Sequence, residues 1–279
     1  MRTIPYDATR DALYHPDLAA SIFPVEGRVS EELLCAESAR LVYKHFERTA
    51  GEKAQVDQAL RSVGFNVVSY FARGSTQAFA ARNAESDTAL VAFRGTEPDD
   101  VMDLADDLNA LWTAWPQGGR VHKGFKRALE LVRKDVVNWI EQHRPRRLLL
   151  TGHSLGAALS TLLASLRNPD RLVTFGSPAV GDHDFAATLP ANTARRYVDC
   201  CDLVTRVPPE NFGFEHVGTR LYINSLGQVI PNATEDHIKA DRRAGREDYF
   251  QQHAWKKGNV AIRDLADHAP INYVYALRP

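Results

Sequence analysis

The chain is poor in cysteine, and its few cysteines are badly placed for disulfide bonds. Its 279 residues include Cys35 and the neighbours Cys200 and Cys201. Three cysteines cannot all pair within one chain, and adjacent cysteines rarely form a relaxed bridge. The sequence therefore excludes a disulfide framework, and we expect the protein to be insensitive to reducing agents.

An excess of charge of either sign is also missing. The 34 lysines and arginines balance 35 acidic residues, which gives a formal net charge of -1 at pH 7. Domains that bind nucleic acid or anionic membranes concentrate positive charge, so the composition supports no nucleic-acid partner. Nothing in the sequence implies an obligate protein partner. The length suits a single domain over residues 1–279 with a large buried core.

Motifs for metal ions, phosphates and secretion are missing as well. No Cys/His cluster has metal-ligand spacing and no Gly-rich phosphate loop occurs, so we expect neither a metal nor a cofactor. Residues 1–20 lack the continuous apolar core of a secretory signal. We therefore expect the chain as given to be either intracellular or already processed, and the initial methionine favours a cytoplasmic location.

One long segment, residues 148–166, carries no formal charge. Its length is close to the roughly 20 apolar residues that a membrane-spanning helix needs. However, Thr151, Gly152, His153, Ser154 and Gly156 fall together in its first half. A buried strand at 148–150 that turns sharply into a helix from about Leu155 explains both halves, so we prefer this interpretation.

The turn has the sequence Gly-His-Ser-Leu-Gly at residues 152–156, which matches the G-x-S-x-G nucleophile elbow. A serine hydroxyl is a poor nucleophile until a base removes its proton, and an acid must orient that base. In α/β-hydrolases the chain order is serine, acid, histidine, so both partners of Ser154 should follow it. We expect the neighbouring His153 to point away from the serine. The candidates for the two partners are Asp182, Asp184, Asp199 and Asp202 as acids, and His183, His216, His237, His253 and His268 as bases.

Hydrophobic periodicity predicts strands that alternate with helices around this turn. Alternation of this kind implies a largely parallel sheet covered on both faces. The charged stretch 235–257 is expected on the surface and in part helical. Helices are predicted at 30–48, with Ser30 as the N-cap, and at 52–64, 125–143 and from 155; strands are predicted at 65–73, 76–82, 88–95, 171–178, 195–204 and 220–230.

Several ordered motifs resemble those of class 3 lipases, the fungal-type triacylglycerol lipases and their bacterial and plant relatives. The resemblance covers residues 30 to 279. It implies an α/β-hydrolase fold with a mainly parallel central sheet flanked by helices and a helical lid, and cofactor-free hydrolysis of carboxylic esters through an acyl-enzyme. The motifs are VAFRGT (91–96), VHKGF (121–125), GHSLGAALS (152–160), FGSPAVGD (175–182), DLVTRVPP (202–209), HVGTRLYI (216–223) and DHAPINY (267–273).

The resemblance also implies roles for individual residues. It makes Ser154 the nucleophile, Asp202 the acid with Asp199 as its main rival, and His268 the base. The backbone N–H of Leu155, directly after the nucleophile, is one expected donor to the oxyanion. By resemblance, Thr96 supplies the second donor, and Asp107 steadies the hydroxyl of Thr96.

Residues 97–117 are expected to form the lid. Apolar residues there fall on one helical face and aspartates mostly on the other, a pattern that also fits a permanently packed helix. The leading substrate is a triacylglycerol at a transient lipid–water interface. An esterase, a phospholipase A1 or a feruloyl-type esterase remains an alternative on the same fold, and a catalytically silent binding module is a further one.

Overall fold

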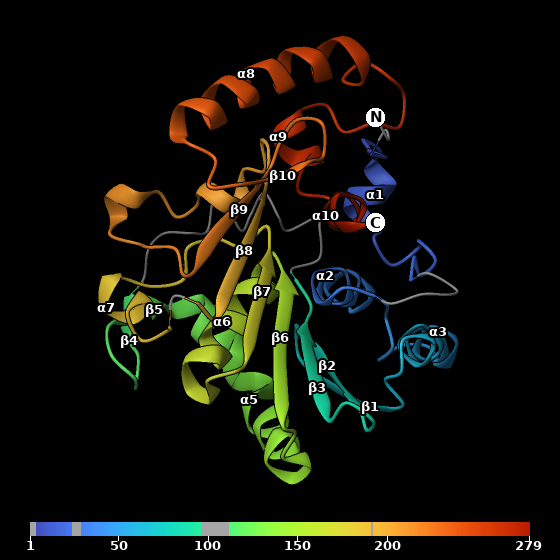
Figure 1. The fold of residues 1–279 in the computed structure, drawn as a ribbon, viewed down its shortest axis with the longest axis vertical. Helices are drawn as coiled ribbons and strands as arrows, with labels where there is room; N and C mark the ends of the chain where they lie inside the picture. Colours follow the sequence, from blue (N-terminus) through green and yellow to red (C-terminus); the bar gives the residue numbers. More distant parts are fainter. Residues whose placement is uncertain (1–3, 24–28, 96–111, 191) are drawn as a thin grey trace.

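An eight-stranded sheet runs through the protein, in the strand order β1-β2-β3-β6-β7-β8-β9-β10 (Figure 1). The computed structural model describes residues 4–23, 29–95, 112–190 and 192–279. A hairpin of β4 and β5 lies outside the sheet. The strands are β1 (Val67–Arg73), β2 (Thr76–Asn83), β3 (Thr88–Phe93), β4 (Trp112–Ala114), β5 (Arg120–His122), β6 (Arg147–His153), β7 (Arg171–Phe175), β8 (Ala194–Asp199), β9 (Thr219–Ile223) and β10 (Val229–Pro231).

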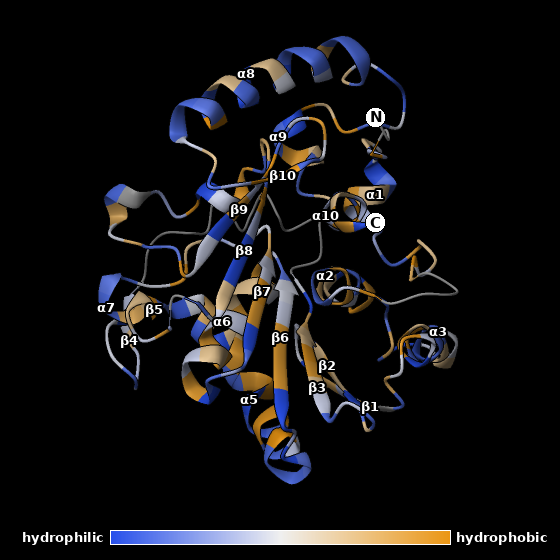
Figure 2. Cartoon of the chain, in the orientation of Figure 1, coloured by the Kyte–Doolittle hydropathy of each residue, from blue (hydrophilic) through white to orange (hydrophobic). Residues whose placement is uncertain are grey.

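The middle of the sheet is parallel and buried. Strands β3, β6, β7, β8 and β9 pair in parallel, whereas β1, β2 and β10 add antiparallel edges. Strand β3 and the 148–153 part of β6 are buried throughout, as expected for strands covered on both faces. The predicted mainly parallel sheet is confirmed, and Figure 2 shows its apolar centre.

Helices cover both faces of the sheet (Figure 1). Apolar residues of α2, α3 and α10 pack on one face, and those of α5 and α6 pack on the other. Helix α8 lies beyond the carboxyl ends of the parallel strands. The α-helices are α1 (Arg10–Tyr14), α2 (Glu31–Leu41), α3 (Ala50–Ser62), α5 (Lys123–His143), α6 (Leu155–Arg167), α7 (His183–Ala186), α8 (Glu235–Gln252), α9 (Arg263–Ala266) and α10 (Pro270–Leu277).

The predicted helix at 30–48 is correct at its start and wrong at its end. Ser30 caps α2, since its hydroxyl accepts the N–H of Leu33. The helix ends at Leu41, where the backbone tightens into i→i+3 turns such as Lys44 N–H to Leu41 C=O. The helices predicted at 52–64 and 125–143 are confirmed as α3 and α5.

The uncharged segment 148–166 forms a strand and a helix, as predicted. Strand β6 ends at His153 and helix α6 begins at Leu155, with Ser154 between them. None of the described helices combines the length and the apolar character that a membrane crossing requires.

Only the last residues of the predicted lid, 112–117, fall within the described part of the chain. Residues 96–111, which include Thr96 and Asp107, lie outside the described residues. The helix predicted over 97–117 is wrong from residue 112 onward, because Trp112–Ala114 forms β4 and pairs with β5. The chain turns back through Gly118 and Gly119, both at positive φ, which a helix does not allow. Trp112 stacks on Phe214 with ring centroids 3.9 Å apart.

Two glycines let β3, β6 and α6 approach one another at the turn. A Cβ added to Gly152 would lie 2.3 Å from the backbone of Gly156. A Cβ added to Gly156 would lie 2.1 Å from the carbonyl oxygen of Phe93. Both obstacles are backbone atoms, which cannot move aside as the end of a flexible side chain can.

We therefore expect Gly156→Ala to lower the free energy of unfolding by about 3 kcal/mol, the upper range for overpacking a core. Urea unfolding would measure it. Gly51→Ala in α3 is the matched control, because a Cβ there meets no atom within 4 Å. The control should leave stability unchanged or raise it by up to about 1 kcal/mol. Equal effects of the two substitutions would contradict the close approach.

Candidate active site

Ser154 stands at the corner between β6 and α6 in a strained backbone conformation. Its φ is 57° and its ψ is -128°, and a non-glycine residue rarely adopts a positive φ. Its backbone N–H donates to the carbonyl of Phe175 in β7, 3.0 Å away, which fixes the turn against the neighbouring strand. The hydroxyl does not cap α6. The side chain is therefore left for another partner.

That partner is His268, which follows α9 in the chain. Its Nε2 lies 3.0 Å from the hydroxyl oxygen of Ser154. Its Nδ1 lies 2.9 Å and 3.0 Å from the two carboxylate oxygens of Asp202. Because a carboxylate only accepts, the proton of the neutral imidazole resides on Nδ1, and Nε2 faces the serine hydroxyl as an acceptor. The structure thus brings together the serine, acid and histidine singled out from the sequence.

Asp202 is buried, and neighbouring donors hold its carboxylate in place. The N–H of Val204 donates to Oδ1 over 2.9 Å, and the hydroxyl of Tyr273 donates to Oδ2 over 2.6 Å. The Tyr273 hydroxyl accepts the N–H of Asp199 in turn. Burial, together with Asp202 and Asp199, raises the pKa of Tyr273 well above its usual range, so the phenol remains a donor.

Sequence reasoning missed the contact of Tyr273. The residue ends the DHAPINY motif, five positions after His268, and helix α10 brings it back onto the acid. Helical spacing alone does not distinguish this residue from an ordinary core tyrosine. The only sequence signal was its place in the motif.

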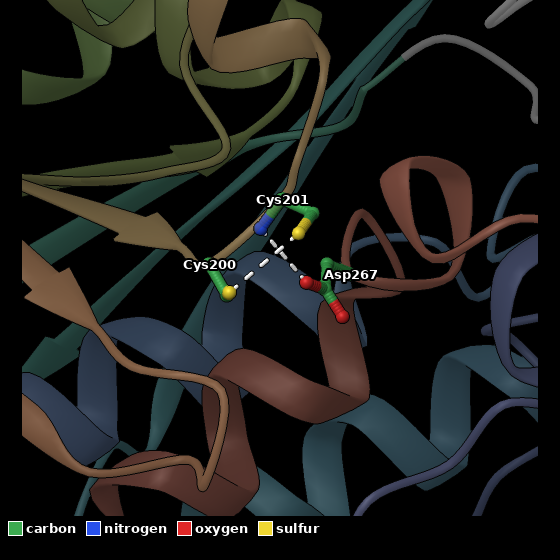
Figure 3. Close-up of side chains that lie close together, drawn as sticks. All are labelled: Cys200, Cys201 and Asp267. Atoms are coloured by element: carbon green, nitrogen blue, oxygen red, sulfur yellow. Dashed lines mark hydrogen bonds between the residues drawn. The ribbon is translucent and has the colours of Figure 1, made fainter. Parts of the chain in front are cut away.

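Further polar contacts lie behind Asp202 and His268, and Figure 3 draws those among Cys200, Cys201 and Asp267. The N–H of Cys201 donates to Asp267 over 2.8 Å, which joins the residue before Asp202 to the residue before His268. The Asp267 carboxylate also accepts from Arg263 and from the hydroxyl of Tyr6. These contacts therefore fix the relative position of the two loops that carry the acid and the base.

The same cluster has the composition of a metal site. Atoms of Cys200, Cys201 and Asp267 that could ligate an ion lie within 4.8 Å of one another, and the two Sγ atoms are 3.6 Å apart (Figure 3). Coordination by Asp267 would compete with its contacts to Arg263 and Cys201. All three cysteines are free and buried. Cys200 and Cys201 follow β8 and do not lie in it, so the strand predicted at 195–204 is too long.

His153 contacts the base. Its ring centroid lies 4.4 Å from that of His268, and its Nδ1 shares a hydrogen bond of 2.9 Å with the Tyr43 hydroxyl. Burial, and then the proximity of His268, lowers the pKa of His153 well below its usual range. His153 is therefore a neutral ring packed against His268, a contact that the sequence analysis did not anticipate.

The other candidate acids and bases lie in different surroundings. The Asp199 side chain accepts from the N–H of Cys200 and does not reach His268. Asp182 caps α7 and pairs with Arg120. The Nε2 of His216 bonds to the carbonyl of Thr205. The other three candidate bases have partners away from Ser154: His183 lies beside Glu215, His237 beside Tyr222, and His253 stacks on Tyr249.

Leu155 is the first residue of α6. Its N–H has no acceptor within the helix and lies at the positive end of the helix dipole. This placement suits an oxyanion donor. Thr96, the second expected donor, lies outside the described residues.

Comparisons with known proteins find similarity to lipases. Residues 90–212 match the model of the lipase (class 3) family. A lipase of Rhizomucor miehei is 32% identical over 185 residues, which cover 60% of this chain and 50% of that protein. The solved lipase of Rhizopus microsporus var. chinensis has a TM-score of 0.57 at 23% identity, over 80% of this chain and 84% of that one.

A further solved structure is a triacylglycerol lipase whose catalytic centre is a serine protease triad. It has a TM-score of 0.52 at 26% identity, over 69% of this chain and 77% of the other. These likenesses confirm the α/β-hydrolase fold. The chain spans about half the length of the curated relatives it matches, from 41% to 64% for three of them.

The buried carboxyl of Asp199 generates a pH-dependent prediction. Burial, and then the neighbouring Asp267, raises the pKa of Asp199 well above its usual range. The proton is therefore bound more tightly in the folded protein, and the stability that it contributes is lost as the pH rises through the folded pKa. Asn resembles the protonated acid and cannot lose that proton. We expect the melting temperature of Asp199→Asn relative to wild type to increase between pH 5 and pH 8.

Thermal unfolding in matched buffers would measure this difference. Asp248→Asn changes an exposed carboxyl and should give the same difference at both pH values. A constant difference for Asp199→Asn would show that Asp199 is ionised in the folded protein over this range.

Proposed function

We propose that this chain is a class 3 lipase family member that hydrolyses carboxylic esters through an acyl-enzyme on Ser154, since residues 90–212 match the family model and a Rhizomucor miehei lipase is 32% identical over 185 residues. The observation that carries the proposal is the continuous contact from the Ser154 hydroxyl through His268 to Asp202. An array of this kind activates a serine for acyl transfer. We further propose that residues 1–279 act as one catalytic unit, since strands from residue 67 to residue 231 share one sheet.

In the proposed reaction, His268 Nε2 takes the proton of Ser154 as the serine oxygen attacks the ester carbonyl. Asp202 stabilises the imidazolium that results. The N–H of Leu155 donates to the oxyanion, and we assign the second donor to Thr96. The tetrahedral intermediate collapses when His268 returns the proton to the leaving alcohol. Water then attacks the acyl-enzyme by the same steps and releases the carboxylic acid.

Tyr273 and Val204 support this cycle through the acid. Asp202 must stay correctly oriented while the charge on His268 changes, and two hydrogen bonds to its carboxylate hold it in place. The strained backbone of Ser154 also supports the cycle, because it directs the serine hydroxyl out of α6 and toward His268. The machinery is thus assembled before the substrate arrives.

For the substrate, we propose a triacylglycerol. The support is similarity to a solved triacylglycerol lipase at 26% identity and to the Rhizomucor lipase. The alternatives on the same fold are an esterase for small soluble esters, a phospholipase A1 and a feruloyl-type esterase. A catalytically silent binding module would keep the fold without turnover.

Ser154→Ala should reduce the turnover of p-nitrophenyl butyrate by about five to six orders of magnitude, as removal of a triad serine typically does. Its melting temperature should change little, because its hydroxyl contacts His268 and no backbone group. Ser62→Ala at the end of α3 is the control and should retain full activity. A Ser154→Ala protein with a tenth of wild-type turnover would exclude Ser154 as the nucleophile.

Two further measurements separate the alternatives. A serine-reactive phosphonate should label the wild type stoichiometrically and leave Ser154→Ala unlabelled, whereas a silent binding module would not be labelled at all. Initial rates on emulsified triolein, tributyrin, phosphatidylcholine and methyl ferulate then rank the substrates. We expect the emulsified triacylglycerols to be hydrolysed faster than the phospholipid and the ferulate. Activity confined to dissolved short-chain esters would identify an esterase.

A further inference from the structure

A cavity of about 950 Å³ lies beside the loop that follows Asp202. Thr205, Pro208 and Pro209 of that loop line one side, and Arg196 and Val198 of β8 line another. Ser154, His268 and Asp202 are not among its lining residues. The cavity is therefore separate from the catalytic array.

Arg196 is the unusual residue of this cavity. Its side chain is 9% exposed and lines the cavity, yet it makes no hydrogen bond or ion pair with any residue that the structure describes. The other buried arginines of the described chain have carboxylate partners: Arg40 pairs with Glu37, Arg94 with Glu47 and Arg263 with Asp267. A buried cation without an anion is strongly destabilising unless something else compensates its charge.

Four arginines and two glutamates line the cavity, so its lining carries more positive than negative charge. Two of the arginines are already paired, Arg220 with Glu235 and Arg206 with Asp264. Arg242 donates to the carbonyl of Cys200 and, like Arg196, has no carboxylate partner among the described residues, whereas Glu215 lies beside His183. Burial, together with Arg196 and Arg220, lowers the pKa of His216 to about 3, so this histidine is neutral at physiological pH. The pKa of Arg196 falls only to about 10, which leaves the guanidinium charged.

We propose that this cavity is a binding site for an oxyanion, a carboxylate or phosphoryl group, held by Arg196. The planar guanidinium matches both anions through parallel N–H donors. Val198, Phe214 and the two prolines add apolar walls, which can accept the organic part of a larger anion. The proposal does not depend on the ester hydrolysis assigned to Ser154.

Calorimetric titration with inorganic phosphate and with butyrate, each against chloride at equal ionic strength, tests the site. We expect one site per chain, and the anion that binds more tightly identifies the ligand class. Arg196→Gln should weaken binding by about a hundred-fold, the scale expected when one partner of a buried charge pair is removed. Arg195→Gln is the matched control, because Arg195 directly precedes Arg196 in the same strand and pairs with Glu32. The control should bind as the wild type does.

A second measurement uses stability and does not depend on detecting heat. In a buffer of low anion content, Arg196→Met should melt at a higher temperature than the wild type, because an uncompensated buried charge is removed. Phosphate or butyrate should then raise the melting temperature of the wild type and of Arg195→Gln, and leave Arg196→Met unchanged. Three outcomes would overturn the proposal: no binding of either anion, an equal loss in both glutamine variants, or a lower melting temperature of Arg196→Met in the low-anion buffer.

Discussion

The backbone conformation of Ser154 is the constraint on which the rest of the site depends. At φ 57° and ψ -128° the residue turns a buried strand into a buried helix within one position. That turn is possible only because Gly152, Gly156 and the end of β3 approach at distances that exclude a Cβ. The parallel strands and the core on both faces hold the strained conformation, which otherwise costs about 1–3 kcal/mol. The fold thus stores strain where the hydroxyl must be presented.

Asp202 and His268 come together beside this hydroxyl because their loops lie at the same edge of the sheet. Asp202 follows β8, and the carboxyl ends of parallel strands meet at one edge, where α/β proteins gather their functional residues. His268 comes from outside the sheet, between α9 and α10. Its position is fixed instead by Asp267, whose carboxylate binds Cys201 and Arg263, and by the neutral ring of His153.

The parts of the site that follow from local spacing were predictable from sequence, and those that depend on tertiary contacts were not. The elbow was predictable because the G-x-S-x-G match lies directly after a run of leucines and before a stretch rich in alanine and leucine. The choice of Asp202 over Asp199 rested on the family resemblance. In the structure the Asp202 side chain contacts His268, whereas the Asp199 side chain accepts from Cys200 and only the backbone N–H of Asp199 contacts Tyr273. Tyr43, just after the early end of α2, and Trp112 in β4 likewise contact distant partners, His153 and Phe214, which local periodicity does not reveal.

Strand β8 shows where local and global preferences conflict. A central parallel strand is expected to be apolar on both faces, and Tyr197 and Val198 obey this rule. Arg195 is also an exception, but its charge is paired with Glu32 near the surface. The side chain of Arg196 has no such pair among the described residues, because alternation along the strand turns it toward the opposite, buried face. A residue that breaks the pattern without a compensating contact among the described residues marks either a defect or a functional position. Arg242 lines the same cavity without a carboxylate partner among the described residues, and it favours the second explanation, because a second positive charge beside Arg196 adds cost unless an anion binds there.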